Sequence, residues 1–268
     1  MILSNYHTHT TFCDGKSTAE EVVCEAIASG LSVLGFSGHA PTFFDNRYCM
    51  KDVEAYKSEI TRLKEKYADK IEILLGIEED SHDPISCASD FDYRIGSSHY
   101  IKKNGLYYPV DSSPELFTEC VDAFGGDILE LAEVYYSQLA SYVKERRPDI
   151  VGHFDLITKF EEKQRLGFFE NNDYNRISEK YLEQIIDTCA LIEVNTGAIS
   201  RGYRTSPYPY VNLLELIRRR GGRVVLNSDS HHKSTLTFAF SETRELLRQV
   251  GFTTLAMLSG GKIIEYSI

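Results

Sequence analysis

The chain has 268 residues, of which 42% are apolar, and a formal net charge of −11. This length is enough to bury a sizeable core, and we expect a single domain over residues 1–268 because barrels of this length are often single domains. A nucleic-acid surface is disfavoured, since it needs a concentrated basic face and the chain has no long run of Lys or Arg. The acidic balance is compatible with cation binding.

No stretch approaches the roughly 20 apolar residues needed to span a bilayer. Met1 also leads into the chain without a basic segment and an apolar signal core. We therefore expect a cytoplasmic protein with no membrane contact. The cysteines form no C-x-x-C pair, so buried free thiols are expected rather than a disulfide framework. They are Cys13, Cys24, Cys49, Cys87, Cys120 and Cys189.

The first predicted unit is strand, helix, strand. Residues 2–6 can begin a strand, and residues 31–37 have the pattern of a buried strand. Between them, Ser17 followed by Glu20 predicts a capping box at the start of a helix that runs to about Gly30. The same alternation recurs along the chain. It predicts helices near 52–67, 113–123, 127–145, 174–189, 211–220 and 241–250, and strands over 71–77, 93–97, 149–152, 191–195 and 223–227.

Strands that alternate with helices indicate parallel pairing through crossover connections. Seven or so such strands suit a closed or nearly closed α/β barrel, with a doubly wound open sheet as the main alternative. The longest irregular insertions are 40–51, 81–92 and 196–210. Because loops of that length in a compact domain tend to be functional, we expect them to form the walls of a substrate pocket.

Most of the histidines come just after a predicted strand. The carboxyl ends of parallel strands converge on one face of an α/β fold, so these imidazoles should meet there. Isolated histidines are more often structural or solvated, which is the expectation for His82 and His232. The six that share the strand-end position are His7, His9, His39, His99, His153 and His231.

The polar residues at the strand ends suit a catalytic metal centre. His7 and His9 point to the same side of an extended chain because strand side chains alternate. Glu78 adds a carboxylate that can bridge two cations. The mixture of imidazole and carboxylate, with no thiolate pair, suits Zn, Mn or Fe better than a structural zinc site. Eight candidate ligands are enough for two or three divalent cations: His7, His9, His39, Glu78, His99, His153, Asp229 and His231.

Taken together, these residues resemble the PHP (polymerase and histidinol phosphatase) superfamily. The matching segments occur in the family's order and span nearly the whole chain. The resemblance implies a distorted, TIM-barrel-like (β/α)7 barrel, three divalent metal ions at the strand carboxyl ends and phosphoester hydrolysis. These segments are His7-Thr8-His9, Phe12-Cys13-Asp14-Gly15, Ser37-Gly38-His39, Gly76-Ile77-Glu78, Gly96-Ser97-Ser98-His99, Gly152-His153-Phe154-Asp155 and Ser228-Asp229-Ser230-His231.

Within the superfamily the chain is most similar to the histidinol-phosphate phosphatases, which implies hydrolysis of L-histidinol phosphate in histidine biosynthesis. The arginine that follows Asn-Thr in that group is displaced here, so Arg201 or Arg204 is expected to bind phosphate. Lys159 stands near a position where some relatives have arginine, and it can bind phosphate as a point charge.

The resemblance suggests a mechanism as a hypothesis. A water that bridges two cations would lose a proton near neutral pH, and the hydroxide would attack phosphorus. The predicted catalytic set is Glu78, as the bridging carboxylate, with Asp229, His231 and Asp14. We expect Asp14 to orient a neighbouring group or to donate a proton.

The organic end of histidinol phosphate carries an ammonium and an imidazole, for which carboxylates or aromatic faces are the expected partners. Glu79, Asp80, Tyr203 and Tyr208 are candidates, with none assigned. Two alternative functions stay open. One is a PHP phosphoesterase that acts on another small ester, such as a nucleotide, a sugar phosphate or phosphotyrosine. The other is a regulatory protein that binds metal without catalysis.

Overall fold

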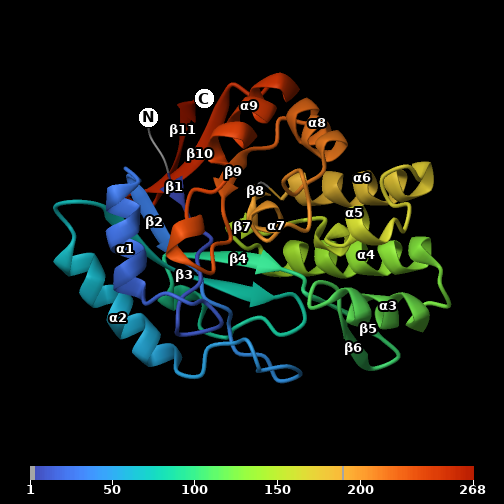
Figure 1. Ribbon diagram of the computed structural model, residues 1–268, viewed down its shortest axis with the longest axis horizontal. Helices are drawn as coiled ribbons and strands as arrows, with labels where there is room; N and C mark the ends of the chain where they lie inside the picture. Colours follow the sequence, from blue (N-terminus) through green and yellow to red (C-terminus); the bar gives the residue numbers. More distant parts are fainter. Residues whose placement is uncertain (1–3, 189) are drawn as a thin grey trace.

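The structure is a computed structural model that describes residues 4–188 and 190–268. Seven parallel strands form its central sheet, in the order β1-β2-β3-β4-β7-β8-β9 (Figure 1). Residues 2 and 3 of the predicted first strand, and Cys189, lie outside the described residues. The strands are β1 (Ser4–Asn5), β2 (Val33–Phe36), β3 (Glu72–Asp80), β4 (Tyr93–Ser97), β7 (Ile150–Val151), β8 (Leu191–Asn195) and β9 (Val224–Asn227).

The central sheet curves until its first and last strands meet. Thr8 and Ser230 form an isolated parallel bridge just beyond β1 and β9. Around it, the Ser230 amide donates to the carbonyl of His7 (3.1 Å) and the His9 amide donates to the carbonyl of Ser230 (2.8 Å). The sheet is therefore a nearly closed seven-stranded barrel. The barrel prediction is confirmed, and the open doubly wound sheet is not what forms.

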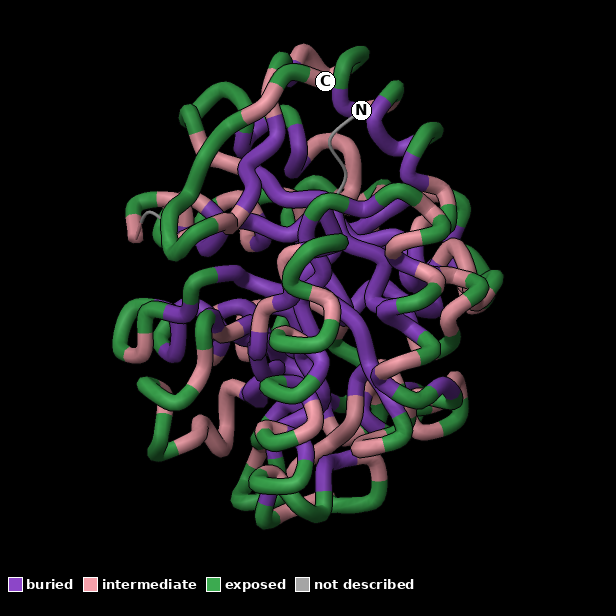
Figure 2. Tube along the Cα trace, turned by 90° about the vertical axis from the view of Figure 1, so that its left-hand side faces the viewer, coloured by how far each residue is buried: buried purple, intermediate pink, exposed green. Residues whose placement is uncertain are grey.

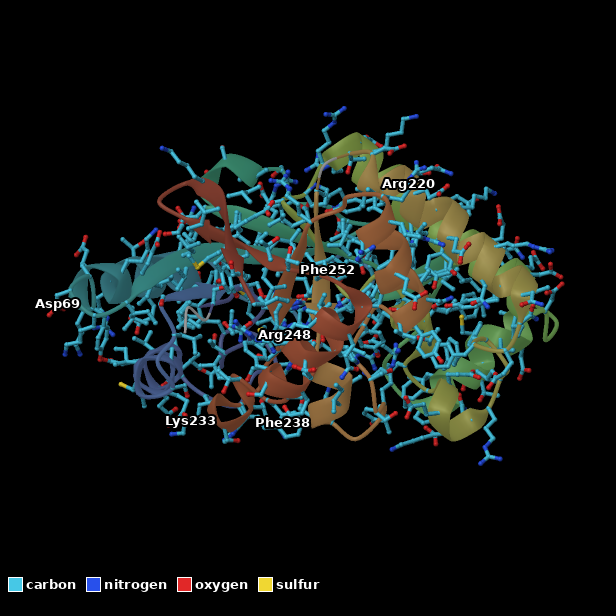
Figure 3. The ribbon with its side chains drawn as sticks, turned by 90° about the horizontal axis from the view of Figure 1, so that it is seen from above. Asp69, Arg220, Lys233, Phe238, Arg248 and Phe252 are labelled. Carbon is cyan, nitrogen blue, oxygen red and sulfur yellow. The ribbon has the colours of Figure 1, made fainter. Side chains whose placement is uncertain are left out.

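Helices cover the outside of the barrel. In Figure 1, α1 and α2 flank the early strands, whereas α4 and α6 lie together on the other side. Buried segments run through the centre, exposed ones lie at the periphery (Figure 2), and Asp69 and Arg220 project outward (Figure 3). No helix of the described residues is both long and apolar enough to cross a membrane. The helices are α1 (Ala19–Ala28), α2 (Val53–Lys66), α3 (Pro114–Ala123), α4 (Ile128–Arg146), α5 (Glu161–Gln164), α6 (Asn172–Ile186), α7 (Gly197–Ser200), α8 (Val211–Arg219) and α9 (Phe240–Val250).

The predicted capping box of the first helix is wrong by one residue. Thr18 is the N-cap of α1: its hydroxyl accepts from the Glu21 amide, and the Glu21 carboxylate accepts from the Thr18 amide. Both Ser17 with Glu20 and Thr18 with Glu21 match the pattern, so the pattern alone could not choose. Ser17 is buried instead, where its hydroxyl accepts from the Lys233 amide (3.1 Å) in the loop after β9.

Two antiparallel hairpins were not predicted from the alternation of strands and helices. The first, β5 (Tyr100–Lys103) with β6 (Leu106–Pro109), follows the carboxyl end of β4. Its turn is Asn104-Gly105, both at positive φ, and an Asn-Gly pair is a strong hairpin signal. The second, β10 (Thr254–Ser259) with β11 (Lys262–Ser267), packs with residues near the starts of the barrel strands, such as Val33. It covers the end of the barrel opposite to the strand carboxyl ends.

A tyrosine fills the barrel interior below the strand carboxyl ends. The Tyr93 hydroxyl, on β4, donates to the carbonyl of Phe36 (3.0 Å) on β2. Gly76 leaves room for the ring, since a Cβ there would lie 2.2 Å from Tyr93 Cζ. This packing gives the residues at the strand ends a rigid floor.

The expectation of buried thiols is only partly right. Cys49 and Cys120 are buried, and Cys13 is half-buried beside His9. Cys24 and Cys87 are exposed, which corrects the prediction for these two. All five described cysteines are free.

Candidate metal centre

The structure brings all eight predicted ligands together at the carboxyl ends of the barrel strands, and Asp14 joins them. β3 continues to Asp80, beyond its predicted end, so Glu78 lies within the strand. The nine residues form four overlapping groups whose ligand atoms lie within 4.8 Å of one another. These groups are His9 with Asp14, His39 and His231; His7 with His153 and Asp229; His7 with His9 and Glu78; and His39 with Glu78 and His99.

Glu78 lies at the centre of this cluster, and its two carboxylate oxygens face different imidazoles. Oε1 lies 3.3 Å from His99 Nε2 and 3.1 Å from His153 Nε2. Oε2 lies 3.2 Å from His7 Nε2, 3.5 Å from His9 Nε2 and 2.9 Å from His39 Nδ1. A carboxylate with its oxygens in two separate sets of nitrogens has the geometry of a bridge between cations.

The other two carboxylates lie on the β1 and β9 side of the cluster. Asp229 Oδ1 lies 3.3 Å from His9 Nε2 and 3.5 Å from His231 Nδ1. Asp14 Oδ2 lies 3.3 Å from His231 Nε2, and its Oδ1 lies 3.8 Å from His39 Nε2. Asp14 therefore lies between two of the imidazoles, and it is a further candidate metal ligand.

These residues fit divalent cations. Two ligand atoms that are each roughly 2.1 Å from one ion in near-tetrahedral geometry are about 3.4 Å apart, which is similar to the separations around Glu78. The buried atoms that face one another at Glu78 Oε2 have no hydrogen-bond partner among the described residues, namely His7 Nε2, His9 Nε2 and Glu78 Oε2 itself. Buried polar atoms are normally satisfied, so atoms of this kind that converge on a few points indicate a missing positive partner.

The charges of the cluster also suit metal binding. Burial lowers the pKa of His9 to about 3, helped by repulsion from His231 and His39, so this imidazole is neutral and keeps a free lone pair. Burial acts against the charged form of Glu78, but the neighbouring imidazoles of His7 and His39 hold its pKa well below the ordinary value. A charged carboxylate among imidazoles is the ligand set that a hard or borderline cation prefers.

Sequence reasoning missed a buried residue behind the ligands. Glu193, on β8, lies with Oε1 2.6 Å from His7 Nδ1, and its Oε2 accepts from the His153 amide (2.7 Å). Asn195 and Asn227 donate to the same carboxylate. An acidic residue flanked by apolar residues in the predicted strand 191–195 was the available signal. Such a partner fixes the tautomer and the orientation of a ligating imidazole.

Beside the cluster lies a cavity of about 490 Å³, and Lys159 and Arg201 are two of the cationic residues that line it. Lys159 is buried, and Arg201 donates through Nη2 to Asp229 Oδ2 (2.8 Å). Burial lowers the pKa of Lys159; Asp111 opposes this effect and the charge of Arg201 adds to it. Two cations near enough to repel each other at one cavity are suited to bind an anion between them.

Arg204, the alternative phosphate ligand, does not reach this cavity. Its guanidinium is buried, with Nη1 donating to Thr158 Oγ1 (2.9 Å) and lying 3.5 Å from Asp155 Oδ2. It also lies over the ring of Tyr208, 4.3 Å from the centroid. The expectation that Arg204 binds phosphate is therefore corrected, because its donors are committed to the protein interior. Of these two arginines, Arg201 is the one that lines the cavity.

Two of the three predicted walls line the cavity. Asp45, Arg47 and Tyr48 come from the 40–51 insertion, and Arg201 comes from the 196–210 insertion. The 81–92 insertion does not contribute to this cavity, which corrects that prediction. Asp111 and Ser112, after the unpredicted β5–β6 hairpin, line it instead.

The candidates for the organic end of a substrate lie elsewhere. Glu79 faces away from Glu78 because strand side chains alternate, and its Oε1 accepts from Arg94 (2.9 Å) and Tyr142 (2.6 Å). Asp80 accepts from the His99 amide (3.1 Å). The two candidate tyrosines, Tyr203 and Tyr208, do not line the cavity. Neither do His82 and His232, which were expected to be structural or solvated.

The fold and the site together define a metal-binding α/β barrel with a cluster of imidazoles and carboxylates at its strand carboxyl ends. The PHP domain family model matches residues 5–197. The chain belongs to the PHP domain family, as the sequence motifs predicted.

Similar proteins match this chain over nearly their whole length. The chain is 27% identical to a protein named probable histidinol-phosphatase from Schizosaccharomyces pombe, covering 95% of this chain and 89% of that one. It is also 27% identical to a protein of the same name from Deinococcus radiodurans, covering 94% and 95%. A solved structure from Lactococcus lactis, described as histidinol phosphate phosphatase complexed with Zn, L-histidinol and phosphate, superposes with a TM-score of 0.76 at 23% identity, covering 98% of this chain and 100% of that one.

Proposed function

We propose that this protein is a metal-dependent phosphomonoesterase that hydrolyses L-histidinol phosphate to L-histidinol and phosphate. The observation that carries the proposal is that Lys159 and Arg201 line one cavity together with residues of the cluster around Glu78. The names of the relatives, and the zinc, histidinol and phosphate of the Lactococcus lactis structure, support the same substrate.

The cluster would hold the cations through residues from all parts of the barrel. We assign the ligands as His7, His9, His39, Glu78, His99, His153, Asp229 and His231. Bound divalent cations supply Lewis acidity for the phosphate oxygens and lower the pKa of nearby water. Eight ligands suit three ions of Zn, Mn or Fe, with positions left over for water and substrate.

The remaining groups of the cavity would bind and orient the phosphate. Lys159 Nζ is held by the carbonyl of Asp111 (2.6 Å) and keeps further N–H groups for a phosphate oxygen. Arg201 is braced by Asp229, so its charge is fixed next to the cluster. Preorganised cations of this kind stabilise the charge that develops on a transferring phosphoryl group.

Asp14 would act as a ligand or as a hydrogen-bond acceptor of His231 rather than as a proton donor. Although burial opposes its charged form, the hydrogen bond with His231 and the charges of His39 and His9 lower the pKa of Asp14. A carboxylate that is ionised at neutral pH holds no proton to give. The proposed catalytic set keeps Asp14 with Glu78, Asp229 and His231.

We further propose that residues 1–268 act as one domain and that the enzyme works in the cytoplasm. The barrel strands and the helices between them share connected buried clusters, and the C-terminal hairpin packs on the barrel. The partner is then a small phosphate ester rather than a nucleic acid, consistent with the net charge of −11.

An ester panel tests the substrate directly. Purified, metal-replete protein is assayed with histidinol phosphate, a nucleoside monophosphate, a sugar phosphate and phosphotyrosine. We expect the highest kcat/KM for histidinol phosphate. Turnover of the other esters without histidinol phosphate would assign the family's chemistry to another substrate. Metal binding without turnover of any ester would favour a non-catalytic regulatory protein.

A further inference from the structure

One carboxylate of the cavity is not assigned to cations or to a strong ion pair. Asp14 lies among the imidazoles, and Asp45 is held by Arg47 through Nε (2.9 Å) and Nη2 (2.6 Å). Asp229 is held by Arg201. Asp111 also lines the cavity, but among the described residues its side chain has one polar partner, Lys159 Nζ, at 3.5 Å from Oδ2.

The contact between Asp111 and Lys159 leaves the carboxylate available. The short bond of Lys159 Nζ goes to the main-chain carbonyl of Asp111 (2.6 Å), not to its side chain. Burial opposes the ionised carboxylate, but Lys159, His99 and His153 lower the pKa of Asp111, so it is negative next to the cluster. The cavity thus holds a negative charge directly beside the cation that we assign to phosphate.

A buried hydroxyl belongs to another residue that lines this cavity. Tyr48 Oη is buried and has no hydrogen-bond partner among the described residues. The ring packs edge-on against His39, with the centroids 4.7 Å apart, and Tyr48 and Asp111 line the same cavity. A buried hydroxyl without a partner in a substrate cavity is suited to meet a polar group of the substrate.

Both residues are held in place by their surroundings. The loop that carries Tyr48 is fixed to the β5–β6 hairpin, since Phe44 stacks on Tyr107 with the centroids 4.4 Å apart. The segment that carries Asp111 is fixed by the Val110 amide, which donates to the carbonyl of His99 (2.9 Å). A site whose groups are fixed before the ligand arrives loses less entropy on binding.

We propose that Asp111, together with the Tyr48 hydroxyl, binds the ammonium group of the substrate and so selects phosphomonoesters of 2-amino alcohols. In such an ester only an oxygen and two carbons separate the ammonium from the phosphorus. Its binding group must therefore lie beside the phosphate-binding cation, where Asp111 lies, and not at a distant wall. This proposal rests on the proposed function only in that the cavity takes phosphate esters.

Two esters of equal size test the selectivity. Ethanolamine phosphate carries an ammonium where propyl phosphate carries a methyl group. Dissociation constants and kcat/KM are measured for both with the metal-replete protein. The wild type should prefer ethanolamine phosphate. Asp111→Asn should lower kcat/KM for ethanolamine phosphate by about tenfold and for propyl phosphate by less than about twofold.

Matched variants separate recognition from indirect effects. Tyr48→Phe should lower the same preference by about threefold, since it removes one neutral hydrogen bond. Glu119→Gln, which removes an exposed charge on α3, and Tyr108→Phe, on β6, should leave the preference unchanged. Circular dichroism checks that each variant folds.

Three results would overturn the proposal. One is a wild type that binds both esters equally. Another is an equal loss for both esters in Asp111→Asn, which would mean that Asp111 acts only by positioning Lys159. The third is a preference that survives both Asp111→Asn and Tyr48→Phe. If histidinol phosphate is not turned over but the selectivity follows Asp111, the proposed function fails while the ammonium subsite stands.

Discussion

His7 Nδ1 lies 2.6 Å from Glu193 Oε1, and both side chains are fully buried. The opposite nitrogen, Nε2, faces Glu78 Oε2 at 3.2 Å. The imidazole thus connects a carboxylate behind the site with the carboxylate at its centre. Since Glu193 also accepts from the His153 amide, one residue of β8 orients groups from the segments that follow β1 and β7.

Removing the charge of Glu193 should therefore weaken metal binding without breaking the barrel. We expect Glu193→Gln to lower metal affinity by about 10- to 100-fold, as is usual for partners that orient ligating histidines. Titration against a chelator of known affinity measures the change, with Glu119→Gln as the control for an exposed charge. Unchanged affinity would mean that Glu193 does not orient His7.

Glu78→Gln tests the bridging carboxylate. The amide keeps the size of the side chain but offers one oxygen instead of two, so cations can no longer share it. We expect kcat to fall by about 10³-fold or more, with the unfolding temperature of the metal-free protein little changed. Steady-state kinetics and thermal denaturation measure the two quantities. His39→Ala should lower kcat in the same way. Activity that persists in each of the two variants would contradict the assigned metal centre.

Two arginines close together in sequence should respond differently to replacement by alanine. Arg201 lines the cavity, so Arg201→Ala should lower kcat/KM by about 10²-fold with little loss of stability. Arg204 lies fully buried beside Asp155. Arg204→Ala should lower the free energy of unfolding by about 3 kcal/mol or more, because it leaves a buried carboxylate unpaired. Urea denaturation and kinetics of both variants test this, and the reverse pattern would contradict the placement of Arg201 at the phosphate.

Metal binding should release protons near neutral pH. Burial opposes the charged form of His7, but Glu193, Glu78 and Asp229 outweigh it and raise the pKa of His7 well above its ordinary value. The pKa of His99 is also raised, because Glu78 and Asp80 outweigh the opposing effect of burial. In the metal-free protein these imidazoles hold protons that must leave before a cation can bind, so affinity should rise with pH.

Calorimetry measures this proton release. Titration of metal in two buffers with different heats of ionisation should give different apparent enthalpies, corresponding to about one proton or more per protein. Identical enthalpies in both buffers would show that these imidazoles are already neutral.

The fold and the residues around Glu78 could be predicted from the sequence, because both predictions follow from the same pattern of strands. Hydrophobic periodicity located the strands, and parallel strands place their carboxyl ends on one face. Residues as distant in sequence as His9 and Asp229 could therefore be assigned to one place. The structure brings them together; their roles as metal ligands stay predictions.

The parts that sequence did not reveal depend on tertiary packing. Tyr48 and Asp111 lie on irregular segments, one held by the stacking of Phe44 on Tyr107 and the other by the Val110 amide on the carbonyl of His99. Arg201 and Arg204 are three residues apart in one loop, and their different tertiary contacts, with Asp229 and with Asp155, decide which of them lines the cavity. Periodicity carries no information about such contacts, since these segments have no regular repeat.

The most direct test of the account is the turnover of histidinol phosphate before and after removal of metal. The protein is stripped with a chelator, assayed, and assayed again after stepwise addition of Zn, Mn or Fe. We predict no phosphate release by the stripped protein, and recovery that levels off at about three ions per chain, the number that eight ligands suit. Full activity in the stripped protein, or no activity at any metal content, would contradict the central claim.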